Sequence, residues 1–286
     1  MEKFDLETVQ NNIQEILKNE SSEYNVEVLN CIFSCIDLTS LKSTDHPESI
    51  ALLCNKVNTL NLSYPEMPQV AAICVYPNMV GAVKENLKFE GIEIASVAAG
   101  FPSSQTFLSI KIAEAKMAVA KGASEIDTVL PVGLFLDENY DLVSKEIRLI
   151  KEAIGNQHLK LILETDLLQD LNQIYKASVL AIKSGADFIK TSTGKEGSKA
   201  SLEAVYVMCK AIKEHFVLTG KMIGLKPAGG ISTAEEAFKY YVLVKNILGE
   251  PWLTSSLFRF GASSLANNII QKIDHLNNNE IKDTYF

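Results

Sequence analysis

The sequence is poor in the residues that most often hold metal ions or form crosslinks. It has only four histidines, and they lie far apart at His46, His158, His215 and His275. The five cysteines are odd in number and scattered through a large chain, so reduced thiols are expected and no pair repeats at a metal-ligand spacing. We therefore expect no metal site, and no motif indicates another cofactor.

Excess positive charge and long apolar runs are also missing. The net charge of −8 argues against a broad surface for nucleic acid or anionic membrane, although it leaves room for a small local anion site. No apolar run is long enough to span a bilayer, and Met1–Asp5 lack the basic and then apolar pattern of a secretory signal. We expect a cytoplasmic protein with neither a nucleic-acid nor a membrane partner.

Apolar residues make up 47% of the 286 positions and recur in short runs separated by helix-like segments. Eight runs have the make-up of buried strands and follow one another at intervals of about thirty residues, as in a (β/α)8 barrel. These runs are Ile32–Leu38, Val70–Tyr76, Ile92–Ala99, Glu125–Leu130, Leu159–Glu164, Asp187–Thr191, Met222–Lys226 and Leu257–Phe260. We predict one (β/α)8 TIM-barrel domain over residues 1–286. A doubly wound open sheet competes, because periodicity alone does not show that a sheet closes.

The connecting segments carry helix signals of their own. A stripe from Leu108 to Val119 predicts a helix that ends at Gly122. Thr233 and Glu236 fit a capping box that opens a helix closing near Gly249. Before the repeating part, residues 1–30 form an extension with one amphipathic helix, whose apolar positions are Leu6, Val9, Ile13, Ile16 and Leu17.

A lysine lies inside the sixth strand-like run. Alternation places Lys190 on the same face as Phe188 and Ser192. A lysine in a buried strand is costly unless it is paired, neutralised or used, and an amine in an apolar pocket can attack a carbonyl group. The alternative is a lysine whose stem lies along the strand end while its ammonium group reaches solvent.

Further charged residues are expected near Lys190. Lys226 lies on the next strand, and two ammonium groups close together disfavour each other's charged form, which favours a free amine. Lys226 could instead be a structural partner of a carboxylate. Asp127 lies within the fourth run, where two lysines would compensate its charge and let it act as an acid or base through water. Asp37 either contacts the same pocket or caps the next segment.

Small residues follow the last two strands. Gly229 and Gly230 end the seventh run, and the stretch Gly261–Ser264 opens the last helix. Such residues let backbone N–H groups approach an anion, and these two loops are the usual phosphate site of a TIM barrel. The sequence therefore predicts a phosphate site at these two loops.

These residues together resemble the deoxyribose-phosphate aldolases, a family of class I, Schiff-base aldolases. The resemblance extends from about Asp37 to Ser264. The matching stretches are Ile36–Thr39, Ala71–Pro77, Gly100–Pro102, Glu125–Asp127, Phe188–Lys195, Lys226–Ile231 and Phe260–Ser264. The sequence departs from the family's pattern at Ser232, where arginine is frequent, and at Asp166, where glycine is usual.

The resemblance implies a role for each matching residue. Lys190 would form the Schiff base, Lys226 would perturb it, and Asp127 would relay protons. The substrate and its phosphate would be held by Asp37, Thr193, Gly194, Lys195, Gly229, Gly230, Gly261, Ser263 and Ser264. Tyr285 corresponds to the terminal tyrosine implicated in proton transfer, although Phe286 follows it here. Residues 277–286 are expected to be a mobile tail.

The resemblance further implies reversible cleavage of 2-deoxy-D-ribose 5-phosphate to acetaldehyde and D-glyceraldehyde 3-phosphate, within deoxyribose phosphate catabolism. It implies a small phosphosugar substrate, no cofactor and a homodimer. Two alternatives are a class I aldolase for another phosphorylated sugar and a non-catalytic phosphosugar-binding barrel. Measured turnover on several substrates distinguishes the three.

Overall fold

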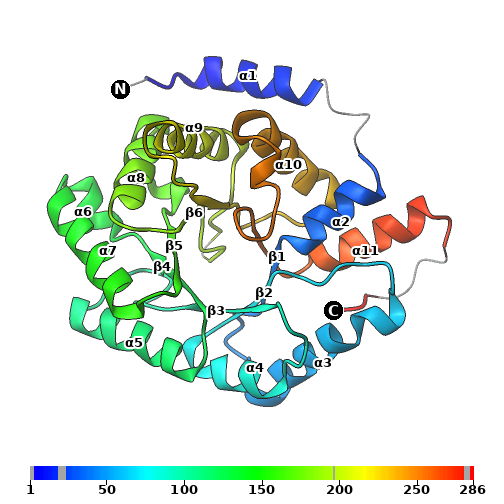
Figure 1. Ribbon diagram of the computed structural model, residues 1–286. Helices are drawn as coiled ribbons and strands as arrows, with labels where there is room; N and C mark the ends of the chain where they lie inside the picture. Colours follow the sequence, from blue (N-terminus) through cyan, green and yellow to red (C-terminus); the bar gives the residue numbers. More distant parts are fainter. Residues whose placement is uncertain (1–2, 19–23, 196, 280–283) are drawn as a thin grey trace.

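Parallel strands form a ring enclosed by helices (Figure 1). The computed structural model describes residues 3–18, 24–195, 197–279 and 284–286. In this part of the chain the sheet has eight strands, in the order β7-β6-β5-β4-β3-β2-β1-β8. Their bounds are β1 Ile36–Thr39, β2 Ala72–Val75, β3 Glu93–Val97, β4 Glu125–Val129, β5 His158–Ile162, β6 Phe188–Lys190, β7 Gly224–Lys226 and β8 Phe260–Ala262.

Two further bridges join β7 and β8 and close the ring. Leu225 pairs with Phe258, and Ala228 pairs with Gly261, in both cases in parallel. The backbone N–H of Arg259 also donates to the carbonyl of Leu225 at 2.9 Å. The predicted (β/α)8 barrel is therefore confirmed over its competitor, the open sheet.

Helices cover the outside of the ring (Figure 1). Their bounds are α1 Leu6–Lys18, α2 Val26–Ser34, α3 Pro47–Ser63, α4 Val80–Asn86, α5 Leu108–Lys121, α6 Val132–Leu136, α7 Tyr140–Ile154, α8 Leu171–Lys183, α9 Leu202–Thr219, α10 Ala234–Leu248 and α11 Leu265–Leu276. Short 3-10 turns occur at Pro77–Met79, Thr165–Leu167 and Glu250–Trp252. None of the described helices is long and apolar enough to cross a membrane.

The predicted helix ends agree with the structure. Gly122 follows α5 in a left-handed conformation with φ of +116°, which a glycine adopts without the strain of a Cβ atom. Thr233 and Glu236 form the capping box of α10, and Gly249 follows its last turn. α11 ends at Leu276, directly before residues 277–286, which were expected to form the tail.

Two predicted boundaries at the ends of the barrel were wrong. The first run was expected to be strand from Ile32, but Ile32 and Phe33 lie in α2, a second N-terminal helix. The side chain of Asn25 caps α2 by accepting the N–H of Val28, and the apolar pair is buried on the helix face. The last strand was expected over Leu257–Phe260 and instead begins at Phe260.

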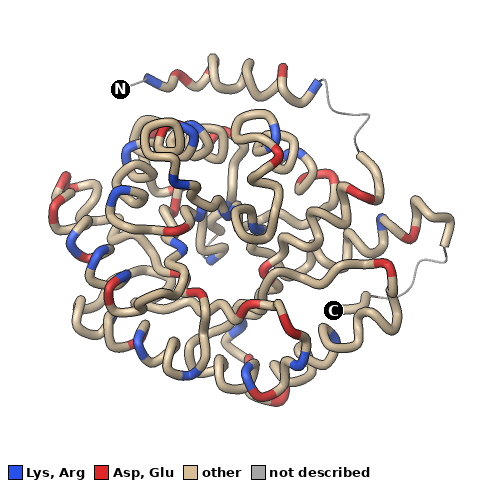
Figure 2. The backbone as a smooth tube through the Cα atoms, viewed as in Figure 1, with Lys and Arg blue, Asp and Glu red and all other residues tan. Residues whose placement is uncertain are grey.

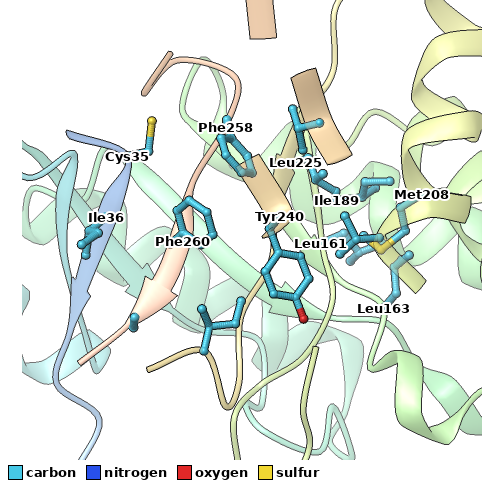
Figure 3. Close-up of a cluster of buried hydrophobic side chains, with 14 of the residues drawn as sticks. Cys35, Ile36, Leu161, Leu163, Ile189, Met208, Leu225, Tyr240, Phe258 and Phe260 are labelled. Carbon is cyan, nitrogen blue, oxygen red and sulfur yellow. The ribbon is translucent and has the colours of Figure 1, made fainter. Parts of the chain in front are cut away.

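The outward face of the strands packs on the helices. Figure 3 shows Ile36, Leu161, Ile189, Leu225 and Phe260, from five different strands, among side chains of the helical layer. All five are at most 1% exposed. Because side chains alternate along a strand, the residues between them point into the ring. The inward positions are where the charged residues lie.

Candidate active site

The interior of the barrel holds an ionic cluster. Figure 2 shows lysine and arginine positions on the strands inside the ring of helices. The members with charged side chains at most 4% exposed are Asp37, Glu125, Asp127, Lys160, Lys190, Lys226 and Arg259. Burying so much charge is tolerated only when the groups pair with one another. The pairing is therefore the central feature of the site.

The upper part of the cluster joins the three residues expected to carry the chemistry. Lys190 and Lys226 are register partners on β6 and β7. Their Nζ atoms lie 2.8 and 2.7 Å from the same atom, Oδ2 of Asp127 on β4. One carboxylate oxygen thus accepts a hydrogen bond from both amines. The structure brings together the residues that the sequence placed on one inward face.

The surroundings shift the pKa values of Lys190 and Lys226 in opposite directions. Burial lowers the pKa of Lys190, and the neighbouring Lys226 lowers it further. The charge of Asp127 opposes both effects, but the net shift of the pKa is downward. Burial also disfavours the charged form of Lys226, yet Asp127 and Asp37 together raise its pKa above the usual range. Lys190 is therefore the amine more readily freed of its proton, and Lys226 remains the cation.

Asp127 is kept ionised by its partners. Burial alone would raise the pKa of its carboxyl group, but the ammonium groups of Lys190 and Lys226 outweigh burial and hold the pKa well below its ordinary value. Its second oxygen, Oδ1, accepts no hydrogen bond from the described residues. Lys160 lies 3.7 Å from that oxygen. An ionised carboxylate with an open oxygen can accept a proton from a substrate or water.

A deeper layer supports these three residues. Arg259 donates from Nη1 to Asp37 at 2.6 Å and from Nη2 to Glu125 at 2.9 Å. Lys160 contacts both carboxylates as well, lying 3.2 Å from Asp37 Oδ2 and closer to Glu125. Asp37 also accepts from Lys226. Asp37 thus contacts the pocket of Lys226, one of the two positions expected for it, and links Arg259 and Lys160 to Lys226.

Sequence reasoning missed Lys160, Glu125 and Arg259. A signal was present, because Lys160 lies between Leu159 and Leu161, the same apolar setting that drew attention to Lys190. Arg259 likewise lies between two phenylalanines. Burial raises the pKa of Glu125, but Lys160 and His158 reverse this and lower it to about 2. Glu125 therefore stays ionised at the base of the cluster.

The cluster contains more cations than anions. Four basic side chains meet three carboxylates in the described part of the barrel interior. One positive charge is unbalanced when every group is ionised, which is costly in a medium of low dielectric constant. Loss of the proton from Lys190 would balance the charges. The arrangement therefore favours a neutral amine at Lys190.

Above Lys190 lies a cavity of about 380 Å³. Its lining includes nine of the predicted site residues, which are Lys190, Thr193, Gly194, Lys195, Gly229, Gly230, Gly261, Ser263 and Ser264. A Cβ atom on Gly261 would lie 2.8 Å from Ala228 Cβ and 3.1 Å from Lys226 Cε. Glycine at this position therefore leaves the room that the buried lysine needs.

The cavity wall presents backbone N–H groups that have no partner among the described residues. They belong to Gly194, Gly229, Gly230, Ile231, Ser263 and Ser264. Ser264 immediately precedes α11, so the positive end of the helix dipole faces the same space. Backbone N–H groups gathered around one cavity beside a helix N-terminus are suited to bind an anion.

Cations also reach this cavity. Lys42 and Lys195 line it from the loops after β1 and β6. The ammonium group of Lys195 contacts the carbonyl of Leu41 across the opening. Ser232, which replaces the family's frequent arginine, bonds instead to Glu236. The sequence did not single out Lys42, which supplies a positive charge from a different loop.

Tyr285 lies away from these groups. Its hydroxyl donates to the carbonyl of Lys56 on α3 at 2.9 Å, and its ring packs edge-on against Tyr64. The N–H of Phe286 donates to Asn267 on α11 at 2.7 Å. The described end of the tail thus contacts two helices, and residues 280–283 of the tail that was expected to be mobile lie outside the described residues.

A TIM barrel with a buried lysine beneath a cavity lined by loops after its strands has the architecture of an enzyme active site. A model of the DeoC/LacD family of aldolases matches residues 33–268, and the chain belongs to this family. It is therefore an aldolase, a carbon–carbon lyase.

The names of similar proteins agree with this family assignment. A human protein named deoxyribose-phosphate aldolase is 43% identical over 251 residues, which is 84% of this chain and 79% of the relative. A bovine protein of the same name is 42% identical, with 85% and 79% covered. Among solved structures, the deoxyribose phosphate aldolase of Aeropyrum pernix, described as tetrameric, has a TM-score of 0.66 at 22% identity, with 96% of this chain and 100% of that chain covered. An aldolase called QR15 has a TM-score of 0.69 at 27% identity, covering 86% and 98%.

Proposed function

We propose that this aldolase reversibly cleaves 2-deoxy-D-ribose 5-phosphate to acetaldehyde and D-glyceraldehyde 3-phosphate, through a Schiff base on Lys190. The observation that carries the proposal is the position of Lys190. Its amine is buried, shares Asp127 with the cation Lys226, and faces a cavity lined by backbone N–H groups that have no partner in the described part of the chain. The names of the relatives support the choice of deoxyribose phosphate as substrate. The expected place of the enzyme is deoxyribose phosphate catabolism.

The reaction follows from this geometry. The free amine of Lys190 attacks the aldehyde carbon C1, and loss of water gives a protonated imine. The C3 hydroxyl gives up its proton as the C2–C3 bond breaks, and the bonding electrons move into the imine to form an enamine. Asp127, with its open oxygen, accepts that proton through water, and Lys226 stabilises the carboxylate. Protonation of C2 and hydrolysis then release acetaldehyde and restore the lysine.

The phosphate end of the substrate occupies the upper wall of the cavity. The N–H groups of Gly229, Gly230 and Ser264 would donate to phosphate oxygens, and Lys42 and Lys195 would supply positive charge. This arrangement fixes the direction of the substrate, with its phosphate away from the ionic cluster and its aldehyde toward Lys190. Tyr285 retains the proton-transfer role that the resemblance predicts only if the tail leaves α3.

Turnover on a panel of sugars tests the function. Release of acetaldehyde from deoxyribose 5-phosphate should exceed release of any aldehyde from ribose 5-phosphate or fructose 6-phosphate by about 10² or more, since a site built for one substrate rejects others on this scale. Faster cleavage of another phosphorylated sugar would indicate a different class I aldolase. Binding of the sugars with no turnover would indicate a non-catalytic barrel.

Replacing Ser264 with glutamate tests the phosphate site. The new carboxylate would face the helix N-terminus and repel phosphate, so KM for deoxyribose 5-phosphate should rise by about tenfold or more. KM for unphosphorylated deoxyribose should change far less. Ser264→Ala is the matched control, because it keeps the backbone N–H and should alter KM by less than about threefold. Equal losses for both sugars in the glutamate variant would show that this loop does not hold phosphate.

The resemblance also predicted a homodimer. The related Aeropyrum pernix structure is described as a tetramer. We therefore propose a homo-oligomer for this chain.

A further inference from the structure

Glu164 follows strand β5 and reaches into the loop after β6. Its residue is 6% exposed. One of its oxygens, Oε1, accepts the backbone N–H of Thr193 at 3.0 Å and also the hydroxyl of Ser198. These two donors flank the segment that contains Gly194 and Lys195, both of which line the cavity above Lys190. A single carboxylate oxygen therefore holds both ends of a wall of the cavity.

The backbone at Glu164 is strained. Its φ of +53° and ψ of +60° lie in the left-handed region, which costs free energy for any residue with a Cβ atom. Neighbouring hydrogen bonds impose this conformation. The N–H of Leu163 donates to the carbonyl of Lys190 at 2.8 Å, and that of Thr165 donates to Thr191 at 3.0 Å. Strain of this kind persists where the surrounding structure fixes it, often at functional sites.

The loop after β6 contacts the loop after β7, so a movement of the first would shift the second. The N–H of Ala200 donates to the carbonyl of Gly229 at 3.0 Å. The carbonyl oxygen of Ser198 lies so close to Gly229 that a Cβ atom there would be 2.6 Å from it. A shift of Ser198 would therefore act on Gly229, which lines the cavity and whose N–H has no partner among the described residues.

We propose that Glu164 is a positioning residue for phosphate binding. It acts through Thr193 and Ser198, which set the positions of the Gly194 and Gly229 amide groups. Glu164 itself lines a neighbouring cavity of about 450 Å³, beside Asp166, and not the cavity above Lys190. The inference rests on the proposed phosphate site. A negative charge close to a phosphate weakens its binding. Glu164 can therefore favour phosphate binding only through the position in which it holds the loop.

Two substitutions at Glu164 separate geometry from charge. Glu164→Gln removes the charge, but its single amide oxygen can still accept both hydrogen bonds, so the inhibition constant of inorganic phosphate should stay within about threefold. Glu164→Leu removes the acceptor. Both the inhibition constant of inorganic phosphate and KM for deoxyribose 5-phosphate should then rise by about tenfold or more, the scale of lost bonds to a charged group. KM for unphosphorylated deoxyribose should change much less.

Three controls make the result decisive. Asp166→Asn, at an exposed carboxylate that accepts the N–H of Lys199 at 2.7 Å, should leave phosphate inhibition within about twofold because asparagine still accepts that bond. Borohydride trapping of acetaldehyde on Lys190 should persist in Glu164→Leu. A persistent adduct would show that the barrel of this variant is intact. If Glu164→Leu does not fold, Ser198→Ala replaces it and should weaken phosphate inhibition by about threefold or more.

Several outcomes would overturn the proposal. Tighter phosphate binding in both Glu164 variants would mean that charge, not position, is the role of this residue. Unchanged inhibition in Glu164→Leu, or in Ser198→Ala, would mean that the clamp does not set the loop. If inorganic phosphate fails to inhibit the unmodified enzyme while acetaldehyde is still trapped on Lys190, the proposed phosphate site is wrong and the inference falls with it.

Discussion

Replacing Lys190 with alanine should abolish both turnover and the formation of a trapped imine. Borohydride reduction in the presence of deoxyribose 5-phosphate should place the adduct on the peptide that contains Lys190, read by mass spectrometry. The variant should lose turnover by a factor on the order of 10⁴ or more, the scale seen when a covalent nucleophile is removed. The reason is that Lys190 combines a lowered pKa with access to the cavity.

The fold should survive this change. Asp127 keeps Lys226 as a partner at 2.7 Å, so no buried carboxylate is left unpaired. Lys195→Ala is the matched control, because Lys195 lines the same cavity but its ammonium group contacts the carbonyl of Leu41. The adduct should remain on Lys190 in that variant. An adduct mapped to Lys226 or Lys195 in the unmodified enzyme would refute the assignment.

Replacing Lys226 with methionine should slow turnover and change its dependence on pH. Burial lowers the pKa of Lys190 most strongly, Asp127 opposes this, and Lys226 adds to the lowering. Without Lys226 the pKa of Lys190 should rise, so its amine becomes protonated at a higher pH. The acidic limb of kcat/KM, where activity falls as this amine gains a proton, should therefore move to higher pH. At neutral pH kcat should fall by a factor of about 10² to 10⁴, the scale of losing a group in proton transfer.

Lys160→Met is the matched control for this experiment. It removes the same charge from the same cluster, but Lys160 interacts with Asp37, Glu125 and Asp127 and lies in the deeper layer. Its effect on the acidic limb should be the smaller one. In Lys226→Met, Asp37 retains Lys160 and Arg259, and Asp127 retains Lys190. A pH profile that does not move in Lys226→Met would show that this cation does not tune Lys190.

The barrel and three of its interior charges could be predicted because both depend on local patterns. Strand residues alternate between two environments, so Lys190 between Ile189 and Thr191 had to point away from the helical layer. Parallel strands also bring their carboxyl ends to one rim, so Lys190, Lys226 and the glycine-rich loops were expected together. The predicted strand boundaries at Ile32 and Leu257 were wrong because Ile32 belongs to a helix and Leu257 to the segment that precedes β8.

The deeper layer depends on contacts between distant parts of the chain. Arg259 and Asp37 are 222 positions apart, and Arg259 and Glu125 are 134 positions apart. Alternation indicates that such residues point inward, but which of them meet depends on how the closed ring brings strands into register. Asp37 therefore seemed a pocket or cap residue from its sequence context, and only the closed ring makes it the hub of the cluster.

The sequence by itself determined that strands and helices alternate along this chain and that Lys190, Lys226 and Asp127 lie on strands, because strand periodicity is a local property, whereas closure of the sheet into a barrel was decided by the tertiary structure. The tertiary structure decided which charges neutralise one another, which amide groups remain unpartnered, and which loops meet. Lys42 reaches the cavity, Glu164 clamps Thr193 and Ser198, and Tyr285 lies on α3. Each of these is a contact between segments that only folding brings together, and pairing energies in a buried cluster depend on such contacts.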